Sequence, residues 1–236
     1  MNYVDHYKKD AEEFDYFEPR SGATLADEKR LREYIISKIP SSPSFILDSG
    51  CGSAWGASEL LPKGHTVVST DISFVNVSKA VEKYQSGRHF GVVCDSLRLP
   101  FKDNAFDAVI ASEIIEHTTD PENFVHSLLR TAKQNGKLIV TTPYKEKIQY
   151  TLCVHCNQKT PLHAHLHSFD ENILTGFGKK AGAEKIEFSI FGNKHLIFLR
   201  TYVILKYLPF ALWKITDKLF TKLLGKPVHI LLEYYK

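Results

Sequence analysis

Along much of the chain, short hydrophobic runs alternate with segments in which apolar residues recur every three or four positions. The short runs have the length of buried strands, and the segments between them have the spacing of amphipathic helices. Five such runs follow one another, at residues 45–48, 66–70, 90–94, 108–111 and 137–141. Strands that alternate with helices in this way predict a parallel sheet covered by helices on both faces.

The segments on either side of this part predict further helices and two more strands. Apolar residues recur at helical spacing within residues 1–40, which are expected to form a helical cap. Residues 185–191 and 228–235 have the pattern of strands, and residues 199–224 between them have a helical spacing that Pro209 interrupts. We expect an α/β fold with a Rossmann-like, seven-stranded, mostly parallel sheet, an antiparallel last strand, an N-terminal helical cap and a C-terminal helical insertion.

The chain has 236 residues, of which 43% are hydrophobic, and this is enough for one α/β domain with a full core. We expect a single structural domain with consecutive parts. These are the helical cap at residues 1–40, a cofactor-binding core at 41–143, a loop insertion with cysteines and histidines at 144–169, and the remainder of the sheet at 170–236 with an apolar, basic helical lid at about 199–225. A loop as long as this insertion is usually functional or carries structure of its own.

The most informative segment follows the first expected strand. There an apolar run ends in Asp48, and the chain turns through Gly50, Cys51 and Gly52 toward a helix. Glycine permits a tight turn and lets backbone N–H groups approach a ligand, while the start of the helix presents unpaired N–H groups and a positive dipole. The segment predicts a nucleotide-type cofactor site, and the acid before the glycines favours a ligand with a cationic group.

Further motifs follow in order near the ends of later strands: Asp71, then Cys94-Asp95-Ser96, then Phe106–Ile110 with Glu116-His117 after it. With these features the sequence resembles the class I S-adenosylmethionine (SAM)-dependent methyltransferases of the type 11 methyltransferase family. The resemblance is close between Asp48 and Thr142 and loose elsewhere, and there is some similarity to the ubiquinone-biosynthesis O-methyltransferases. One departure lies in the loop, where Ala54 replaces the usual third glycine and Gly56 comes two residues later.

The resemblance implies where each part of SAM would bind. Asp71 would accept hydrogen bonds from the ribose hydroxyls, and Asp95 from the adenine amino group. Asp48 would lie near the amino-acid end of SAM, and the carbonyl group of Ser112 would accept from the amino group. The expected cofactor-binding residues are Asp48, Gly50, Cys51, Gly52, Asp71, Ile72, Asp95, Ser96 and Ser112.

The segment after the fourth expected strand carries candidate chemistry for the methyl acceptor. If a helix begins there, Glu113, Glu116 and His117 share one face, as positions i, i+3 and i+4. Two carboxylates and an imidazole suit Mg²⁺, Mn²⁺ or Fe²⁺, and the pattern looks like the metal site of ubiquinone-biosynthesis and small-RNA O-methyltransferases. In this interpretation His167 is the fourth ligand. Without a metal, His117 is the expected general base, because imidazole titrates near neutral pH.

A competing metal site involves the cysteines of the loop insertion. Cys153 and Cys156 have Cys-x-x-Cys spacing, and His163, His165 and His167 follow them. These residue types suit tetrahedral zinc, which would hold the long loop together. The alternative is a solvated loop with reduced thiols. Because His167 cannot serve two metals, the zinc interpretation and the carboxylate–imidazole interpretation compete in part.

Charge is unevenly placed along the chain, although the net charge is only +3. After Phe191, lysine and arginine residues greatly outnumber Asp217 and Glu233. The apolar, basic segment 199–224 suits either an interfacial helix at a membrane surface or a lid packed on the sheet. Few cysteines, a polar N-terminus and the lack of an apolar run of spanning length predict a cytoplasmic protein, peripheral to the membrane in the first of these cases.

The sequence as a whole predicts a SAM-dependent methyltransferase that moves a methyl group to a hydroxyl of a small or lipid-like molecule. A divalent metal, Mg or similar at the Glu/His site or Zn at the Cys/His loop, is a candidate second cofactor. Two alternatives stay open. One is an RNA 2′-O-methyltransferase, which is disfavoured because no basic surface interleaved with aromatic residues occurs outside the tail. The other is a non-catalytic SAM-binding module.

Overall fold

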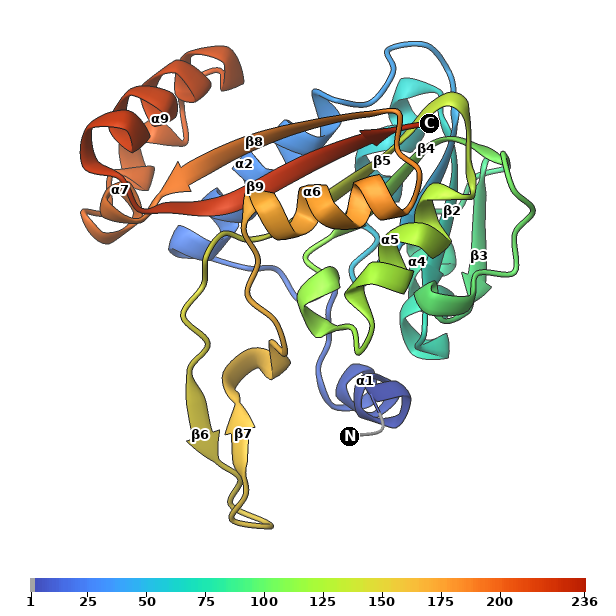
Figure 1. Cartoon of the computed structure of the whole chain (residues 1–236), viewed down its shortest axis with the longest axis horizontal. Helices are drawn as coiled ribbons and strands as arrows, with labels where there is room; N and C mark the ends of the chain where they lie inside the picture. The colour runs from blue at the N-terminus through green and yellow to red at the C-terminus, as the bar shows by residue number, and fades with distance from the viewer. Residues whose placement is uncertain (1–2) are drawn as a thin grey trace.

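The computed structural model describes residues 3–236, apart from the side chains of residues 197 and 198. Across these residues a seven-stranded sheet with the strand order β3-β2-β1-β4-β5-β9-β8 forms the centre of the molecule (Figure 1). The bounds of its strands are β1 Phe45–Ser49, β2 Thr66–Asp71, β3 His89–Val93, β4 Phe106–Ser112, β5 Ala132–Pro143, β8 Lys185–Asn193 and β9 Pro227–Tyr235.

The last strand runs against its neighbours. Strand β1 pairs in parallel with β2 and β4, and β4 pairs in parallel with β5. Strand β9 pairs antiparallel with both β5 and β8. The expected mostly parallel sheet with an antiparallel last strand is therefore confirmed. The order also places the carboxyl ends of β1 and β4 side by side where the direction of chain winding changes, which is where open α/β sheets bind ligands.

Helices cover both faces of this sheet. Their bounds are α1 Tyr3–Glu13, α2 Gly22–Ile36, α3 Trp55–Leu60, α4 Phe74–Lys83, α5 Pro121–Leu129, α6 Glu171–Lys180, α7 Lys194–Phe198, α8 Tyr202–Leu205 and α9 Phe210–Leu224. Helices α5 and α6 contribute to the apolar layer on the face that is in front in Figure 1. Helices α2, α3, α4 and α9 contribute to the layer on the opposite face. The expected helices on both faces are thus present.

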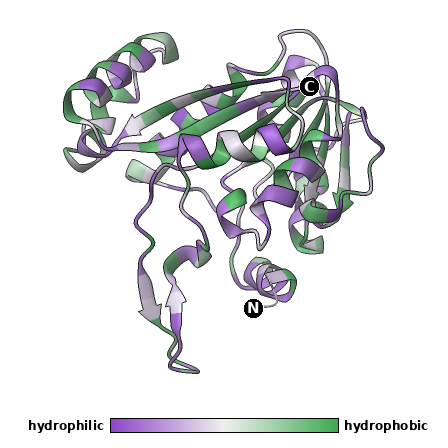
Figure 2. Cartoon of the chain, viewed as in Figure 1, coloured by the Kyte–Doolittle hydropathy of each residue, from purple (hydrophilic) through white to green (hydrophobic). Residues whose placement is uncertain are grey.

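The central strands β1 and β4 are largely apolar because both of their faces are buried. Successive side chains of a strand point to opposite faces of the sheet. On β4, Val109 belongs to the layer under α5 and α6, whereas Ala108 and Ile110 belong to the layer under α2 and α3. On β1, Leu47 belongs to the layer under α5 and α6, and Ile46 belongs to the layer under α2 and α3. The central strands are accordingly among the most hydrophobic parts of the ribbon in Figure 2.

The long loop insertion carries a small hairpin of its own. Strands β6, Tyr150–Leu152, and β7, Lys159–Pro161, pair antiparallel and extend away from the body of the molecule in Figure 1. The C-terminal segment forms three helices, and Pro209 stands directly before α9, where the sequence predicts an interruption. In the part of the chain that the structure describes, no helix combines the length and the apolar character that crossing a membrane requires.

Candidate active site

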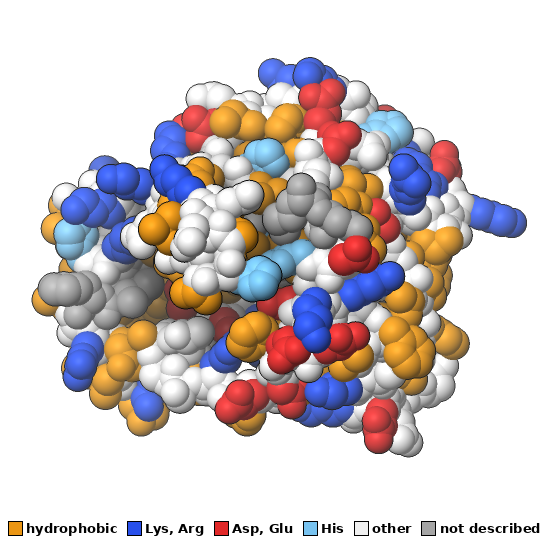
Figure 3. Space-filling view, turned by 90° about the horizontal axis from the view of Figure 1, so that it is seen from below, with side chains coloured by type: hydrophobic (Ala, Val, Ile, Leu, Met, Phe, Trp, Pro, Cys, Tyr) orange, Lys and Arg blue, Asp and Glu red, His pale blue; other side chains and the backbone are white. Residues whose placement is uncertain are grey.

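A cavity of about 930 Å³ lies at the carboxyl ends of β1, β2 and β4. Its wall also includes residues of α1 and α2 and the base of the β6–β7 hairpin. Ligand pockets usually measure about 300–1,000 Å³, so the cavity has room for a nucleoside-sized ligand together with a second molecule. Figure 3 shows the molecule from below, where acidic and histidine side chains gather near the middle of the face.

The glycine turn after β1 borders this cavity. Gly50 and Gly52 have φ angles of +70° and +46°, the left-handed conformation that favours glycine. A Cβ atom at Gly50 would lie 2.6 Å from Cδ1 of Ile114, so a larger residue would also require the Ile114 side chain to move. Ala54 has a φ of +53° and completes the same turn without a glycine. Gly50, Cys51 and Gly52 all line the cavity, as the sequence predicts.

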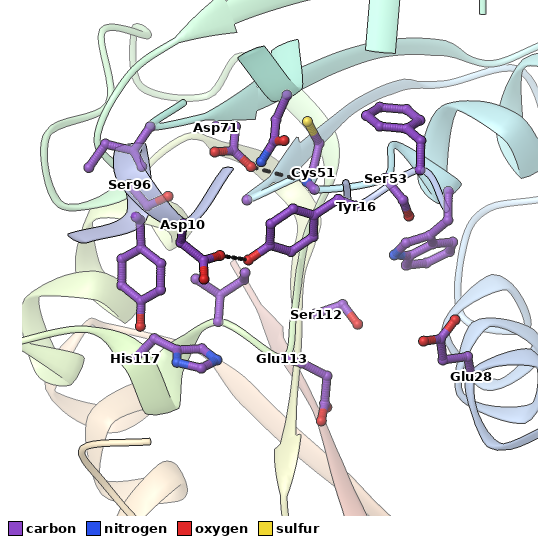
Figure 4. A pocket seen from close by; sticks show the side chains of 18 of the residues that line it. Asp10, Tyr16, Glu28, Cys51, Ser53, Asp71, Ser96, Ser112, Glu113 and His117 are labelled. Atoms are coloured by element: carbon purple, nitrogen blue, oxygen red, sulfur yellow. Dashed lines mark hydrogen bonds between the residues drawn. The ribbon is translucent and has the colours of Figure 1, made fainter. Parts of the chain in front are cut away.

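Asp71 lines the cavity at the end of β2. Its Oδ2 atom accepts a hydrogen bond from the N–H group of Gly52 at 3.1 Å, and its Oδ1 atom accepts one from Ser73 at 2.9 Å. Burial raises the pKa of Asp71, and these N–H donors oppose that rise. The carboxylate is therefore held in one orientation beside the glycine turn (Figure 4), with remaining lone pairs for a ligand.

Asp95, after β3, lines the cavity together with Ile72 and Ser96. The Oδ1 atom of Asp95 accepts a hydrogen bond from the N–H group of Leu97 at 2.9 Å, and its Oδ2 atom accepts one from the hydroxyl of Tyr3 on α1. Two acids from neighbouring strand ends thus face one cavity, each fixed by bonds within the protein.

Helix α1 and the segment after it supply cavity residues that sequence analysis did not single out. Tyr7, Asp10 and Tyr16 all line the cavity, and the Tyr16 hydroxyl donates to the Asp10 carboxylate (Figure 4). Burial raises the pKa of both tyrosines, so both hydroxyls keep their protons at neutral pH. The helical spacing of Tyr3, Tyr7 and Asp10 is a signal that could have identified this face.

Glu113 borders the opposite side of the cavity, after β4. Its φ of +56° is unusual for a residue with a side chain. One oxygen of its carboxylate lies 3.6 Å from Nδ1 of His229 on β9, and Nε2 of His229 pairs with Asp27 of α2 at 2.9 Å. Burial opposes the protonated imidazole of His229, but the neighbouring carboxylates outweigh burial and raise its pKa to about 10.

The helix expected to begin at this point is reduced to a single turn. A 3₁₀ turn spans Ile115–His117, and Glu113 lies outside it in the left-handed conformation. The prediction that Glu113, Glu116 and His117 share one helical face is therefore wrong, because the strand end bends sharply at Glu113 before the turn begins.

His117 also lines the cavity, beside Tyr7 and His165, whose rings lie 5.6 Å and 4.8 Å from its own, centroid to centroid. Its Nδ1 atom lies 3.3 Å from the carbonyl oxygen of Ala164. Since a carbonyl can only accept, Nδ1 carries the proton and Nε2 is left as an acceptor. Burial lowers the pKa of His117 to about 4, with His165 adding to the shift, so the ring is neutral at physiological pH.

Three metal-ligating side chains meet next to the cavity. One donor atom each of Glu116, His117 and His165 lies within 4.8 Å of the others. Glu116 is 1% exposed, and its Oε2 atom accepts from the hydroxyl of Thr142 at 3.0 Å. Its Oε1 atom is buried without a hydrogen-bond partner, and burial raises its pKa well above the usual range. A carboxylate and two imidazoles form a donor set that suits a divalent transition metal.

This set differs from the expected one. His167 does not join it, because its Nε2 atom bonds the carbonyl oxygen of Thr118 at 3.0 Å. Glu113 pairs with His229 instead. His165 takes the place expected for His167. Its Nδ1 atom bonds the carboxylate of Glu146, so that Nε2 is its free ligand atom.

The cysteines of the insertion and His155 between them lie apart from His163, His165 and His167. Cys153 and Cys156 are in the turn at the tip of the hairpin, where the N–H group of Cys153 donates to Gln158 at 2.9 Å. His163 lies beyond the base of the hairpin, at the cavity. Within residues 3–236, no cluster of three or more potential ligands contains a cysteine. Among the described residues the zinc interpretation finds no assembled ligand set, because the paired strands separate Cys153 and Cys156 from His163 and His165.

Comparison with known proteins identifies the core of the chain. Residues 47–140 match the family model described as a methyltransferase domain. A ubiquinone biosynthesis O-methyltransferase of Rickettsia felis is 32% identical over 126 residues, which cover 51% of this chain and 52% of that protein. The mitochondrial ubiquinone biosynthesis O-methyltransferase of Bos taurus is 34% identical over 123 residues, which cover 48% of this chain and 32% of that protein. Residues 47–140 therefore form a methyltransferase domain, and the matched segment spans about half or less of these relatives' own length.

Solved structures share the fold of this methyltransferase domain and its surroundings. A phosphoethanolamine N-methyltransferase of Haemonchus contortus, in complex with phosphomonomethylethanolamine and S-adenosylhomocysteine, superposes with a TM-score of 0.59 at 19% identity and covers 89% of this chain and 52% of that chain. A SAM-dependent methyltransferase of Mesorhizobium loti superposes with a TM-score of 0.62 at 12% identity, covering 89% of this chain and 100% of that one. At these identities the likeness establishes the fold alone.

The cavity of the methyltransferase domain is lined by most of the residues that the sequence assigns to SAM binding. All of the predicted cofactor-binding residues except Asp48 line it. Asp48 is 2% exposed and lies behind the glycine turn, where its Oδ2 atom has no hydrogen-bond partner. Burial and the charge of Asp71 raise the pKa of Asp48 to about 7. Its carboxylate thus supports the turn from the inside and does not face the cavity.

Proposed function

We propose that this chain binds SAM and transfers its methyl group to a hydroxyl of a small or lipid-like acceptor. The observation that carries the proposal is that carboxylates suited to SAM and an imidazole suited to proton removal line the same cavity. Asp71 and Asp95 line the side that we assign to the cofactor, and the neutral imidazole of His117 lies on the other side from Asp71 (Figure 4). Methyl transfer to a hydroxyl requires a methyl donor and a proton-accepting group in one cavity.

The cofactor side would hold SAM through its polar ends. Asp71 would accept from the ribose hydroxyls, Asp95 from the adenine amino group, and the backbone from Gly50 to Gly52 would pass beneath the amino-acid end. When bound, SAM supplies a methyl group that its sulfonium makes electrophilic. The protein's contribution is then to align the acceptor oxygen with that group and to remove the acceptor's proton.

His117 is the residue we assign to proton removal. Its hydrogen bond to the carbonyl of Ala164 leaves the lone pair on Nε2 free, and its neutral state makes that lone pair available at physiological pH. A positioned base of this kind typically accelerates a reaction about 10²–10⁴-fold.

A lipid-like acceptor is supported by two observations. The wall formed by α2 and α3 is partly apolar, since Leu25, Leu31 and Trp55 line the cavity there. The named relatives are ubiquinone biosynthesis O-methyltransferases, although the matched segment covers only about half of the Rickettsia felis protein, at 52%.

A divalent metal is the alternative role of this cluster, because the Nε2 lone pair of His117 cannot bind an ion and accept a proton at the same time. Glu116, His117 and His165 would hold the ion, since the buried Oε1 atom of Glu116 lacks a partner and both histidines have a free Nε2 atom. Such an ion, when bound, lowers the pKa of a coordinated hydroxyl. Metal analysis of the purified protein, with Glu116→Gln and His165→Gln variants, tests this alternative separately. Retention of the same metal by both variants would rule out this ligand set.

The main experiment combines calorimetry with a transfer assay. Binding of SAM is measured by isothermal titration, and transfer of an isotopically labelled methyl group is followed by mass spectrometry over hydroxylated aromatic lipids, small phenols, amines and short RNA. We expect SAM to bind and label to appear on a hydroxyl of the first two classes. No binding at millimolar SAM overturns the proposal. Binding with label only on RNA or on amines would assign a different acceptor, and binding with no label on any of them would support a non-catalytic module.

A further inference from the structure

Helix α9 presents a row of large apolar side chains to solvent. The row consists of Leu212, Ile215, Leu219 and Leu223, whose exposed fractions lie between 53% and 69%. Their spacing of three and four residues places them on one side of the helix. We call this row the leucine face. Trp213 and Asp217, which are 7% and 3% exposed, mark the opposite, buried side.

The buried side of α9 is firmly attached to the body of the protein. The ring of Trp213 stacks on Phe210 and lies under the guanidinium of Arg30 of α2, 5.1 Å from the ring centroid. The carboxylate of Asp217 accepts from the N–H group of Gly192 on β8 at 3.1 Å. The leucine face therefore points outward because the other side of the helix is anchored, and not because the helix lacks a place to pack.

Basic residues border the leucine face. Lys214, Lys218 and Lys222 follow one another at intervals of four residues, so they form a second row along the same helix, and all three are exposed. Arg200, before α8, is also exposed. Between residues 194 and 226 the single acidic residue is Asp217, which is buried against β8. The exposed surface of this segment is thus apolar and cationic, with no exposed carboxylate to balance it.

The exposed apolar surface continues onto α8, the helix before α9. Val203 and Ile204 of α8 are 49% and 74% exposed, and Tyr207 after it is 78% exposed. A surface of this size that is both apolar and basic is typical of helices that lie in the headgroup region of an anionic bilayer. Apolar side chains reach the acyl boundary there, while lysines remain at the level of the phosphates.

We propose that residues 199–224 bind the surface of an anionic phospholipid membrane, with the leucine face inserted and the lysine row at the phosphates. Charge complementarity selects this partner over a second copy of the chain, since a second copy would bring Lys214, Lys218 and Lys222 against other cations. The inference goes beyond the proposed function, because it concerns a surface outside the cavity and needs neither SAM nor an acceptor.

Helix α2 connects this surface with the cavity. The guanidinium of Arg30 donates to the carbonyl oxygens of Leu205 and Leu208, at 2.6 Å and 3.0 Å, and thereby fixes the segment between α8 and α9. On the same helix, Leu31, the residue after Arg30, and Leu25, five residues before it, line the cavity. A protein that binds lipid through residues 199–224 would therefore hold its cavity close to the membrane, which suits the lipid-like acceptor under the proposed function.

Co-sedimentation with vesicles tests the inference on the whole chain. Vesicles of phosphatidylcholine alone are compared with vesicles that also contain phosphatidylglycerol, at low and high salt. We expect binding to the anionic vesicles that weakens as salt rises. The double variant Ile215→Glu with Leu219→Glu should lower the partition coefficient at least tenfold. The variant Lys218→Gln with Lys222→Gln should lose most of the preference for anionic vesicles.

A matched control places the same change on another exposed apolar pair. Leu152 and Val154 of the hairpin are 66% and 101% exposed, and their replacement by Glu should leave vesicle binding unchanged. Absence of wild-type binding to anionic vesicles, or equal losses in the two glutamate variants, would overturn the inference. A third outcome would also overturn it: the wild type is a dimer that does not bind vesicles, and the Ile215/Leu219 variant is a monomer. The leucine face would then join two copies of the chain. SAM affinity, measured in every variant, reports on the proposed function independently.

Discussion

The carboxylate of Asp48 lies directly against Gly56. A Cβ atom at position 56 would fall 2.5 Å from Oδ2 of Asp48, so only glycine fits there. This contact explains the departure in the cofactor loop, where the usual third glycine is missing. Ala54 adopts the left-handed conformation itself, at a φ of +53°, and the glycine is needed two residues later to make room for the buried acid.

The burial of Asp48 predicts a pH dependence of stability. Because burial and the charge of Asp71 raise the pKa of Asp48 in the folded protein to about 7, the fold binds a proton that the unfolded chain releases near pH 4. This group therefore favours the folded state below about pH 4, and that contribution is lost as the pH rises through 7. We expect Asp48→Asn to remove about 1–3 kcal/mol of the decline in unfolding free energy between pH 5 and pH 8. Urea titrations of both proteins at the two pH values check this, and parallel declines would contradict it.

A second prediction compares a crowded glycine, Gly50, with an uncrowded one, Gly176. Gly50→Ala should destabilise the protein by about 2–4 kcal/mol, because the residue has a φ of +70° and its new Cβ would overlap Ile114. Gly176 lies inside α6 with nothing within 4 Å of an added Cβ. Gly176→Ala should stabilise by about 0.5–1 kcal/mol through helix propensity. Thermal and urea unfolding measure both, and equal effects of the two variants would show that the turn is not constrained as described.

The position of Asp71 and Asp95 at the cavity could be predicted from sequence because it depends on local rules. Polar residues at the ends of parallel strands meet at one edge of the sheet, whatever the lengths of the helices between them. Asp71 and Asp95 are placed by this rule alone. Asp48 follows the same strand pattern, but the direction of its side chain is set by the packing against Gly56, which no spacing reveals.

The acceptor side was predicted less well because it depends on segments distant in sequence. Glu113 turns out of the expected helix and pairs with His229, which is more than 100 positions later. His165, and not His167, comes beside His117, since the chain after the hairpin turns through residues with positive φ at His163 and Ala164. Periodicity carries no information on such a turn.

Asp71→Asn tests the ribose contact. The change keeps the size of the side chain but removes the charge that strengthens its hydrogen bonds, so we expect SAM affinity to fall by about 1.5–3 kcal/mol, or roughly 10–100-fold. The exposed Glu187 on β8 provides a matched control, and Glu187→Gln should bind SAM like the wild type. Calorimetry of the three proteins, with urea unfolding to confirm that each is folded, decides the matter. Unchanged affinity in Asp71→Asn would place the ribose elsewhere.

His117→Gln tests the base and separates it from the metal. Glutamine can keep the bond to the carbonyl of Ala164 but cannot take up a proton, so methyl transfer should slow by about 10²–10⁴-fold while SAM affinity stays within threefold. His126 on α5 is exposed and outside the cavity wall, and His126→Gln should behave like the wild type.

The variant His165→Gln distinguishes a metal-free base from a metal ligand. If His117 acts as a base without metal, His165→Gln should retain most of the rate, whereas equal losses in both variants, together with loss of bound metal, would assign the chemistry to the Glu116–His117–His165 set. A wild-type rate in His117→Gln would exclude both roles.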